Sequence, residues 1–210
     1  MLDAYTIQPI SYACAMEVII REHYLHRRAP CSFAFGLFLQ EDLKGVICYG
    51  TPSSSGLRKG LAGPDNISNV IELTRLWVSD DVPRNGESFL IGNTVRLVDK
   101  EFIVSFAEIQ QGHLGIVYQA TNWHYTGLSA KRTNWHIEGD TRHSQSIGDQ
   151  YRTSAALREK FGDAFSLVPR PRKHRYVFFN ADRRRRKSML KELRYPILPY
   201  PKHAIDFDKE

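Results

Sequence analysis

The hydrophobic positions in the first quarter of the chain follow first a helical and then an extended spacing. Residues 11–24, SYACAMEVIIREHY, carry apolar side chains at intervals of three and four, and Ser11 is a suitable N-cap, so a helix is predicted here. The runs CSFAFGLFLQ (31–40) and KGVICYG (44–50) are almost continuously apolar and predict an antiparallel hairpin. Residues 51–64 are rich in Gly, Ser and Pro, and this composition predicts a mobile loop.

The middle of the chain alternates strands with helices. VIELTRLWV (70–78) and FIVSFA (102–107) are predicted strands, and NGESFLIGNTVRLVDK (85–100) has the spacing of a helix. A further helix is predicted in GHLGIVYQATNWHYTG (112–127). Strands that alternate with helices predict an α/β fold, in which helices flank a mixed sheet with parallel strands at its centre.

The last third of the chain is less regular. Residues 128–170 are mixed and polar, with one predicted helix at 154–161, and we interpret them as an insertion. RYVFF (175–179) predicts the strand that closes the sheet. Asp182 then caps a basic helix that must end before Pro196, because the residue before a proline disfavours helical geometry.

Positive charge is concentrated near the C-terminus. Between Arg170 and Arg194, eleven Lys or Arg residues and two acids give +9, so the rest of the chain, within a total of +6, carries −3. An acidic body with one strongly basic end is typical of a protein that binds nucleic acid. We therefore expect a main domain over 1–180, which includes the insertion, and a basic extension over 181–210. The cations expected to contact nucleic acid are Arg172, Lys173, Arg175, Arg183, Arg184, Arg185, Arg186 and Lys187.

Composition narrows the class of protein. A length of 210 residues with 42% hydrophobic and 25% charged residues is typical of a globular domain. No apolar run approaches the roughly 18 residues of a membrane span, and the N-terminus lacks a signal-peptide pattern. The cysteines Cys14, Cys31 and Cys48 form no CxxC pair and indicate reduced thiols. The expected location is the cytoplasm, with no membrane partner.

The turn inside LWVSDDVPRNGESFLIG (76–92) is the most specific chemical signal. It joins a strand to a helix, and the N–H groups at a helix N-terminus can hold a phosphate. Gly86 and Ser88 are small enough to allow close backbone approach. The candidate cofactor-binding residues are Val78, Arg84, Asn85, Gly86, Ser88 and Phe89.

This turn loosely resembles the pyrophosphate-binding loop of the GCN5-related N-acetyltransferase (GNAT) superfamily. Arg84, Gly86 and Ser88 stand at the matching positions. The resemblance implies a GNAT-like fold and, as cofactor, acetyl-CoA or a related activated donor.

The stretch 112–127 falls where the same superfamily carries its next motif, a helix that ends in Tyr-x-x-x-Gly-Phe. Tyr118 stands at the position of the Tyr, which in the superfamily often protonates the leaving thiolate, and Asn122 begins the pair that replaces Gly-Phe. The resemblance implies that Tyr118 and Asn122 face the cleft. The residues expected to pack into the core are Leu114, Val117 and Ala120.

A closer resemblance covers nearly the whole chain. The segments IELTRLWVSDDVPRNGESFLIG (71–92), 112–127 and KHRYVFFNADRRRRKSMLKELRYPILPYPK (173–202) are similar to the Mom family of DNA-modification proteins of Mu-like bacteriophages, an offshoot of the acetyltransferase fold. The resemblance implies an enzyme that converts adenine in double-stranded DNA to its N6-carbamoylmethyl (acetamido) form in the infected bacterial cell. The modification would protect phage DNA from host restriction. The donor would be a small molecule or carrier-bound, because simple acetyl transfer does not yield this product.

Modification of adenine at N6 requires a general base in the enzyme. The N6 lone pair is delocalised into the ring, so N6 is a poor nucleophile. Glu72, on the strand before the turn, is the candidate base, and a rim carboxylate paired with Arg75 is the alternative. We also count Arg75 and Ser105 as catalytic candidates, although a buried strand serine is the commoner case.

Aromatic residues offer a surface for the target base. A stacked amine cannot be reached by an enzyme, so the adenine must leave the duplex. Trp123, Trp135 and Tyr125 are candidates to stack against it.

Three histidines leave a metal site open as an alternative. His124 and His136 end two copies of TNWH, and His143 follows, but the spacing is not that of a tight metal site, so no ligand is predicted. Two other functions stay open as well. The chain could be an N-acetyltransferase acting on a protein or small amine, or a non-enzymatic DNA-binding protein on a degenerate acetyltransferase scaffold.

Overall fold

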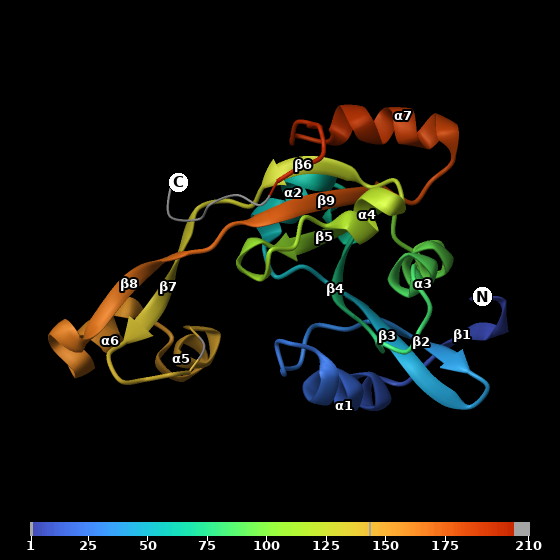
Figure 1. The fold of residues 1–210 in the computed structure, drawn as a ribbon. Coiled ribbons are helices and arrows are strands. Elements are labelled where there is room, and N and C mark those ends of the chain that lie inside the picture. The colour runs from blue at the N-terminus through green and yellow to red at the C-terminus, as the bar shows by residue number, and fades with distance from the viewer. Residues whose placement is uncertain (1, 143, 204–210) are drawn as a thin grey trace.

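A seven-stranded mixed sheet forms the centre of the molecule in the computed structural model, which describes residues 2–142 and 144–203 (Figure 1). The strand order is β1-β2-β3-β4-β5-β9-β6, and β4 with β5 is the parallel pair. The strands of this sheet are Tyr5–Pro9 (β1), Phe33–Leu39 (β2), Asp42–Gly50 (β3), Val70–Val78 (β4), Phe102–Glu108 (β5), His124–Leu128 (β6) and Lys173–Phe179 (β9). The predicted mixed α/β sheet, with parallel strands at its centre, is confirmed.

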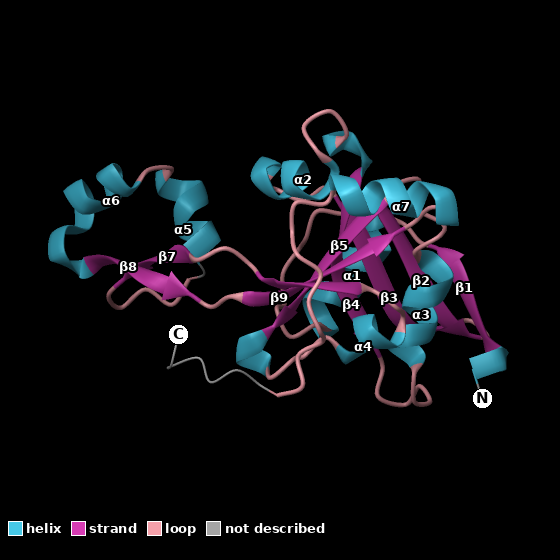
Figure 2. Ribbon diagram, turned by 90° about the horizontal axis from the view of Figure 1, so that it is seen from above, coloured by secondary structure: helices cyan, strands magenta, loops and turns pink. Residues whose placement is uncertain are grey.

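Helices cover both faces of this sheet (Figures 1 and 2). The α-helices are Tyr12–Glu22 (α1), Ser55–Ala62 (α2), Gly86–Thr94 (α3), Ile116–Ala120 (α4), Ser144–Tyr151 (α5), Ser154–Phe161 (α6) and Arg183–Glu192 (α7). The short 3-10 helices are Leu2–Ala4, Ile67–Asn69, Ile109–Gln111 and Gly162–Ala164. On one face, α3 and α4 contribute to the largest core cluster, while α1, α2 and α7 pack on the other face.

The alternation of side chains along the strands decides which helix each residue meets. Ile71 and Ile103 belong to the core cluster that contains α3 residues. Their neighbours Val70 and Phe102 belong to the cluster that contains Met189 of α7. Each central strand is therefore buried on both faces, which explains its nearly continuous apolar sequence.

The predicted hairpin and the predicted caps of α1 and α7 are confirmed. β2 and β3 pair antiparallel, and Ser11 Oγ accepts a hydrogen bond from the Cys14 N–H at 3.2 Å. Asp182 Oδ1 accepts one from the Arg185 N–H at 2.8 Å.

The prediction of a mobile loop over 51–64 is wrong, because α2 lies within it. Ser54 caps this helix by accepting a hydrogen bond from the Leu57 N–H at 3.2 Å. Leu61 and Ala62 are buried against the sheet. Tertiary burial therefore outweighs the low helix propensity of the glycines and serines.

Two predicted helices are shorter than expected. The helix predicted over 85–100 ends at Thr94, whose hydroxyl bonds the Leu90 carbonyl at 2.7 Å and the Tyr49 hydroxyl at 2.8 Å. The helix predicted within 112–127 has only five residues, α4, because Gly112 and Gly115 adopt φ angles of 68° and 73° that interrupt a helix.

Residues 132–170 form a projecting arm (Figures 1 and 2). The arm is a two-stranded sheet of Arg132–Ile137 (β7) and Phe165–Arg170 (β8), joined by α5 and α6. It has a small core of its own, formed by Ile137, Ile147, Leu157 and Phe165. Across the described ranges, 2–142 and 144–203, no helix has the length and apolar character needed to cross a membrane.

Candidate active site

The site is a cavity that opens where two parallel strands separate. β4 and β5 are paired only over Val70–Glu72 and Phe102–Val104, although both strands continue further. Past this point β4 is paired with β3 and β5 with β9, so the two strands diverge. The gap between them is a cavity of about 1280 Å³, lined also by the start of α2, the segment before α4 and the base of the arm.

Glu72 lies at the point of divergence and lines the cavity. Burial raises the pKa of its carboxyl to about 7, although the positive charges of Lys173, Arg75 and Arg170 act in the opposite direction. Arg75 donates instead to the carbonyls of Thr74 and Arg28, at 2.6 and 3.4 Å. Within the described part of the chain Glu72 and Arg75 form no ion pair, so the structure does not support the alternative of a paired rim carboxylate.

Ser105 bridges the two strands just beyond their last backbone pairing. Its hydroxyl lies 3.0 Å from the Leu73 carbonyl oxygen and 2.8 Å from the Tyr118 hydroxyl. A hydroxyl has one proton and a carbonyl only accepts, so both bonds form when Ser105 donates to Leu73 and Tyr118 donates to Ser105. Ser105 and Tyr118 both line the cavity, where the sequence placed them, and both are buried.

Tyr118 stays protonated at neutral pH. Its ring packs between Trp123 and Tyr176, at centroid distances of 5.1 and 5.2 Å. Burial raises the pKa of its hydroxyl to about 12. A phenol in this state can donate a proton and does not act as a base.

The predicted phosphate turn lies beside the cavity, but few of its residues reach it. Val78 lines the cavity, whereas Arg84 and Asn85 are exposed and outside its lining. A Cβ on Gly86 would lie 2.6 Å from Val82 Cγ1. Glycine is therefore required here for packing within the turn.

The other two residues predicted at this turn also lie outside the cavity lining. Ser88 is half-buried on the first turn of α3, and Phe89 packs against the main core.

This turn fits a pyrophosphate only in part. The Glu87 and Ser88 N–H groups lie in the first turn of α3, where helix geometry leaves them without an intrahelical acceptor. The side chains that this region contributes to the cavity, however, include Asp80 and Glu87, and neither is a cation. Because both carboxylates would repel a pyrophosphate, we derive no chemical step through coenzyme A.

Two predictions about the helix around α4 are wrong. Asn122 is exposed at the end of α4 and does not line the cavity. Ala120 is exposed as well, whereas Val117 packs against the main core and Leu114 is half-buried at the cavity. The helix α4 begins only after Gly115, which has a φ of 73°, and the buried residue of this short helix is Tyr118.

The aromatic residues chosen for base stacking are placed elsewhere. Trp123 is fully buried between Tyr118 and Phe178, and Tyr125 is buried too, so neither offers a free ring face. Trp135 lies on the arm, half-buried, with its ring edge-on to Phe165 at 6.4 Å. The stacking role predicted for Trp123 and Tyr125 is wrong, because both rings are buried in the hydrophobic core and cannot contact a DNA base.

A different aromatic group lines the cavity. His23 and Tyr24 follow α1, with stacked rings 4.4 Å apart, and the His113 ring lies edge-on to Tyr24 at 5.9 Å. Tyr24 is 45% exposed, so part of its ring is accessible. Sequence reasoning missed this group, and the signal that could have found it is the His-Tyr pair at the end of the predicted helix.

His23 is neutral in this cluster. Its Nδ1 accepts a hydrogen bond from the Leu25 N–H at 3.1 Å. Burial, followed by the positive charge of Arg75, lowers its pKa to about 4. A neutral ring at this place adds no charge to the cavity wall.

Several of the cations predicted to contact nucleic acid are engaged inside the protein. Lys173 pairs with Glu108 at 2.6 Å, and Arg172 donates to the Ser129 carbonyl at 2.7 Å. Arg175 is buried, donates to Thr126 Oγ1 and stacks on the Tyr195 ring at 3.5 Å.

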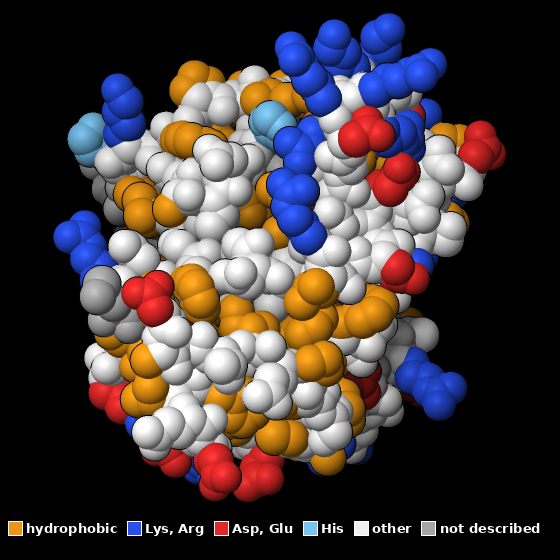
Figure 3. Space-filling view, turned by 90° about the vertical axis from the view of Figure 1, so that its right-hand side faces the viewer, with side chains coloured by type: hydrophobic (Ala, Val, Ile, Leu, Met, Phe, Trp, Pro, Cys, Tyr) orange, Lys and Arg blue, Asp and Glu red, His pale blue; other side chains and the backbone are white. Residues whose placement is uncertain are grey.

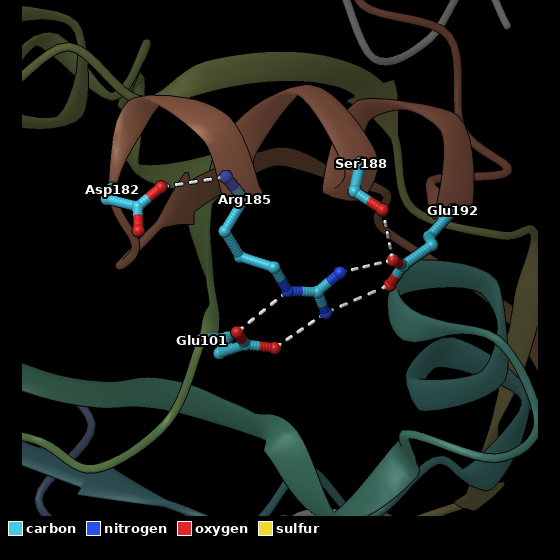
Figure 4. Close-up of polar contacts among 5 residues, drawn as sticks. All are labelled: Glu101, Asp182, Arg185, Ser188 and Glu192. Atoms are coloured by element: carbon cyan, nitrogen blue, oxygen red, sulfur yellow. Dashed lines mark hydrogen bonds and ion pairs between the residues drawn. The ribbon is translucent and has the colours of Figure 1, made fainter.

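Arg185 is likewise a structural residue. Its guanidinium donates to both carboxylate oxygens of Glu101, at 2.8 and 2.7 Å, and also to Glu192 (Figure 4). Carbonyls, hydroxyls and carboxylates of the protein thus occupy the donors of Arg175 and Arg185, and the structure does not favour their predicted nucleic-acid contacts.

The remaining cations of α7 are better placed for a polyanion. Arg183, Arg184 and Lys187 are exposed, and Arg186 is half-buried near the Phe178 ring. Lys and Arg side chains gather over α7 in the space-filling view (Figure 3). No residue of α7 lines the cavity, so this cationic surface is separate from the site.

Two histidines of the metal alternative lie on different sheets of the fold. His124 lies on β6 beside the Phe179 ring, and His136 lies on β7 of the arm. His143 lies outside the described residues. Among the residues that the structure describes, no group of three or more His, Cys, Asp or Glu side chains could hold a metal ion.

Comparisons with known proteins identify a family over nearly the whole chain. The sequence model of the Mom protein family matches residues 4–202. The methylcarbamoylase Mom of Escherichia phage Mu is 30% identical over 206 residues, which are 93% of this chain and 83% of that protein.

Comparison with solved structures gives weaker similarities, to acetyltransferases. Arabidopsis thaliana NAA60 in complex with acetyl-CoA has 10% identity and a TM-score of 0.48, over 83% of this chain and 99% of that one. The ribosomal-protein-S5-alanine acetyltransferase from Vibrio fischeri has 9% identity and a TM-score of 0.47, over 86% of this chain and 95% of that one. We infer nothing about the site from similarities at this level.

Proposed function

The chain belongs to the Mom protein family, and on that premise we propose that it is a transferase that converts adenine in double-stranded DNA to N6-carbamoylmethyladenine. The observation that carries the proposal is Glu72, whose carboxyl lines the cavity between β4 and β5 and has a pKa raised to about 7. A carboxylate of this pKa can accept a proton at neutral pH, and the weakly nucleophilic N6 amine needs such a base.

In the proposed reaction the N6 nitrogen forms a bond to the methylene carbon of the activated donor. One N6 proton passes to the Glu72 carboxylate, and the leaving group departs with its bonding electron pair. Tyr118 lines the same cavity and stays protonated, so its hydroxyl can supply its proton to the leaving group by turning away from Ser105. The donor is an activated small molecule or a carrier-bound group.

The target adenine has to leave the double helix to enter the cavity, because its N6 amine is otherwise stacked and paired. The exposed part of the Tyr24 ring and the exposed His113 ring line this cavity. In the proposal these rings hold the extruded base, in place of the buried Trp123. The modified DNA would resist host restriction enzymes, and the protein would act in the cytoplasm of the infected bacterium.

Mass spectrometry of nucleosides tests the proposal directly. DNA from cells that express the wild-type chain is digested and compared with DNA from cells that express Glu72→Gln. We expect a new deoxyadenosine adduct with the wild type and its loss with the variant. Unmodified deoxyadenosine in both samples overturns the proposal, and acetylated protein or small amines in its place would favour an N-acetyltransferase.

A further inference from the structure

The arm, residues 132–170, presents one face of its two-stranded sheet that its own helices do not cover. Directly opposed residues of β7 and β8 share a face. Trp135, Ile137 and Phe165 point toward α5 and α6 and form the arm's core.

The opposite face of the ribbon is polar and cationic. It carries the three pairs that alternate with the core pairs, and we call it the outer face: Arg132 with Arg170, Asn134 with Val168, and His136 with Ser166. These six side chains are exposed or half-buried, and they include two arginines and no carboxylate.

The outer face begins at the cavity that holds Glu72. Arg132 and Arg170 both line this cavity. Arg132 Nη2 donates to Ser54 Oγ at 3.3 Å, so the base of the arm is connected to the start of α2 across the cavity. The outer face is thus continuous with the candidate active site, in contrast to the cations of α7.

The dimensions of the ribbon suit a groove of duplex DNA. The two paired strands lie about 4.8 Å apart, which is narrower than the groove, and the outer face extends roughly 13 Å along them from Arg132 to His136. The major groove is about 12 Å wide and admits a two-stranded ribbon. Figures 1 and 2 show the arm projecting from the body, with no other helix or strand of the described residues beyond its tip.

We propose that the outer face of the β7–β8 ribbon docks against double-stranded DNA beside the cavity and so presents the target base to Glu72. The inference rests on the proposed function and assigns its DNA-docking surface to the arm. The uncharged polar groups of the ribbon would face the groove, and the two arginines at its base would meet the phosphates next to the extruded nucleotide.

Charge substitutions at Ser166 test this surface without touching the cavity. Ser166 is exposed on the outer face and does not line the cavity. Ser166→Lys and Ser166→Glu are compared with the matched pair Ala155→Lys and Ala155→Glu, because Ala155 is exposed on α6 at the other side of the ribbon. Fluorescence anisotropy with a duplex of about 30 base pairs gives the dissociation constant, and thermal melting verifies that all four variants fold.

We expect Ser166→Lys to tighten binding and Ser166→Glu to weaken it, each by about three- to tenfold, because the charge lies close to phosphates. The dissociation constants of the Ala155 variants should stay within about twofold of the wild-type value. Their added charge would lie away from the DNA, and salt screens its electrostatic effect over that distance. A benzophenone side chain placed at position 166 should crosslink to the duplex, and one at position 155 should not.

Equal effects at positions 166 and 155, with no crosslink from 166, overturn the docking surface. The nucleoside measurement on wild-type DNA separates this failure from that of the proposed function. If the adduct is present while the Ser166 variants bind like the Ala155 variants, only the docking surface is wrong. If the adduct is absent, the proposed function is wrong, and the anisotropy series still decides whether the arm binds DNA.

Discussion

At the scale of single residues, Glu72 links chemistry to stability. Its pKa rises from 4.5 to about 7 in the folded chain because burial disfavours the charged form. The folded state therefore binds this proton more tightly than the unfolded state does. The associated free energy of unfolding is fully present below pH 4.5 and is lost as the pH rises through 7.

We predict that Glu72→Gln removes this loss of stability. The variant should match the wild type near pH 4 and exceed it by up to about 3 kcal/mol above pH 8, because 1.36 kcal/mol corresponds to one pKa unit. Urea unfolding at a series of pH values measures the difference. A wild-type stability that does not fall between pH 5 and 8 relative to the variant would contradict the raised pKa.

The activity of the wild type should depend on the protonation of Glu72 as well, but it should rise with pH where the stability falls. A general base acts when deprotonated, so the modification rate should rise with pH through about 7. The Glu72→Gln variant should lose about 10²- to 10⁴-fold in rate. A rate that is flat from pH 6 to 8 would exclude Glu72 as the base.

Tyr118 offers a second residue-scale test. Tyr118→Phe keeps the ring packed on Trp123 and removes the hydroxyl that bonds Ser105. We expect the rate to fall by about 10²-fold or more if the hydroxyl donates to the leaving group, with a loss of only about 1 kcal/mol in stability. Nucleoside mass spectrometry and thermal melting measure the two effects.

Tyr176→Phe is the matched control for that variant. Tyr176 is fully buried in the same aromatic cluster and its hydroxyl bonds the Leu114 carbonyl, but it does not line the cavity. Its loss should lower stability and leave the rate nearly unchanged. Equal losses of rate in both variants would mean that Tyr118 acts through packing.

At the scale of elements, the start of α3 depends on tight packing. The Cβ of any larger residue at position 86 would lie 2.6 Å from Val82 Cγ1 and 3.1 Å from Val78 Cγ1. We predict that Gly86→Val lowers the stability by about 1 to 3 kcal/mol through overpacking, and reduces activity with it. Differential scanning calorimetry measures this change. An unchanged melting temperature would instead favour the predicted role of Gly86, in which the small residue lets a ligand approach the backbone closely.

The helix α7 combines structural and exposed cations, and the two groups should respond differently. Replacing Arg183, Arg184 and Lys187 by Gln should leave the melting temperature unchanged and reduce the salt dependence of DNA binding. The log–log slope should fall by about 0.9 for each phosphate that the variant no longer neutralises. Arg185→Gln should lower stability by about 1 kcal/mol, because it leaves Glu101 and Glu192 without their shared partner.

A titration of DNA binding against salt, together with thermal melting, separates the two groups. A triple variant with the wild-type slope would show that the exposed face of α7 does not contact DNA. A melting temperature of Arg185→Gln equal to that of the wild type would show that the network in Figure 4 adds no stability.

At the scale of the whole molecule, α7 and the arm are separate elements on one body (Figures 1 and 2). If both contact the same duplex, the loss of binding free energy in a chain that combines Ser166→Glu with the α7 triple variant should equal the sum of the separate losses, within about 0.5 kcal/mol. Anisotropy measurements on the four proteins of this cycle give the result. A combined loss no larger than the greater single loss would mean that the two surfaces do not bind one duplex together.

The sequence by itself determined the features that depend on neighbours along the chain. The apolar runs of β2 and β3 predicted their hairpin, and Ser11 and Asp182 predicted two helix starts, because capping and strand pairing across a short turn are local. Glu72, Ser105 and Tyr118 all line the cavity, and their catalytic roles stay predictions. Glu72 and Ser105 were chosen from their places on predicted strands, and Tyr118 from a resemblance to a known motif.

Only the tertiary structure decided which polar and aromatic side chains are accessible. Trp123 and Tyr24 look equally suited to a base, yet one is fully buried and the other 45% exposed, because the packing of α4 against β9 is not encoded in the spacing of either residue. The same holds for Arg185, whose partner Glu101 lies 84 positions away. The cavity lies where the parallel strands β4 and β5 stop pairing after three residues. Beyond that point β4 pairs with β3 and β5 pairs with β9, and these long-range pairings cannot be read from the sequence.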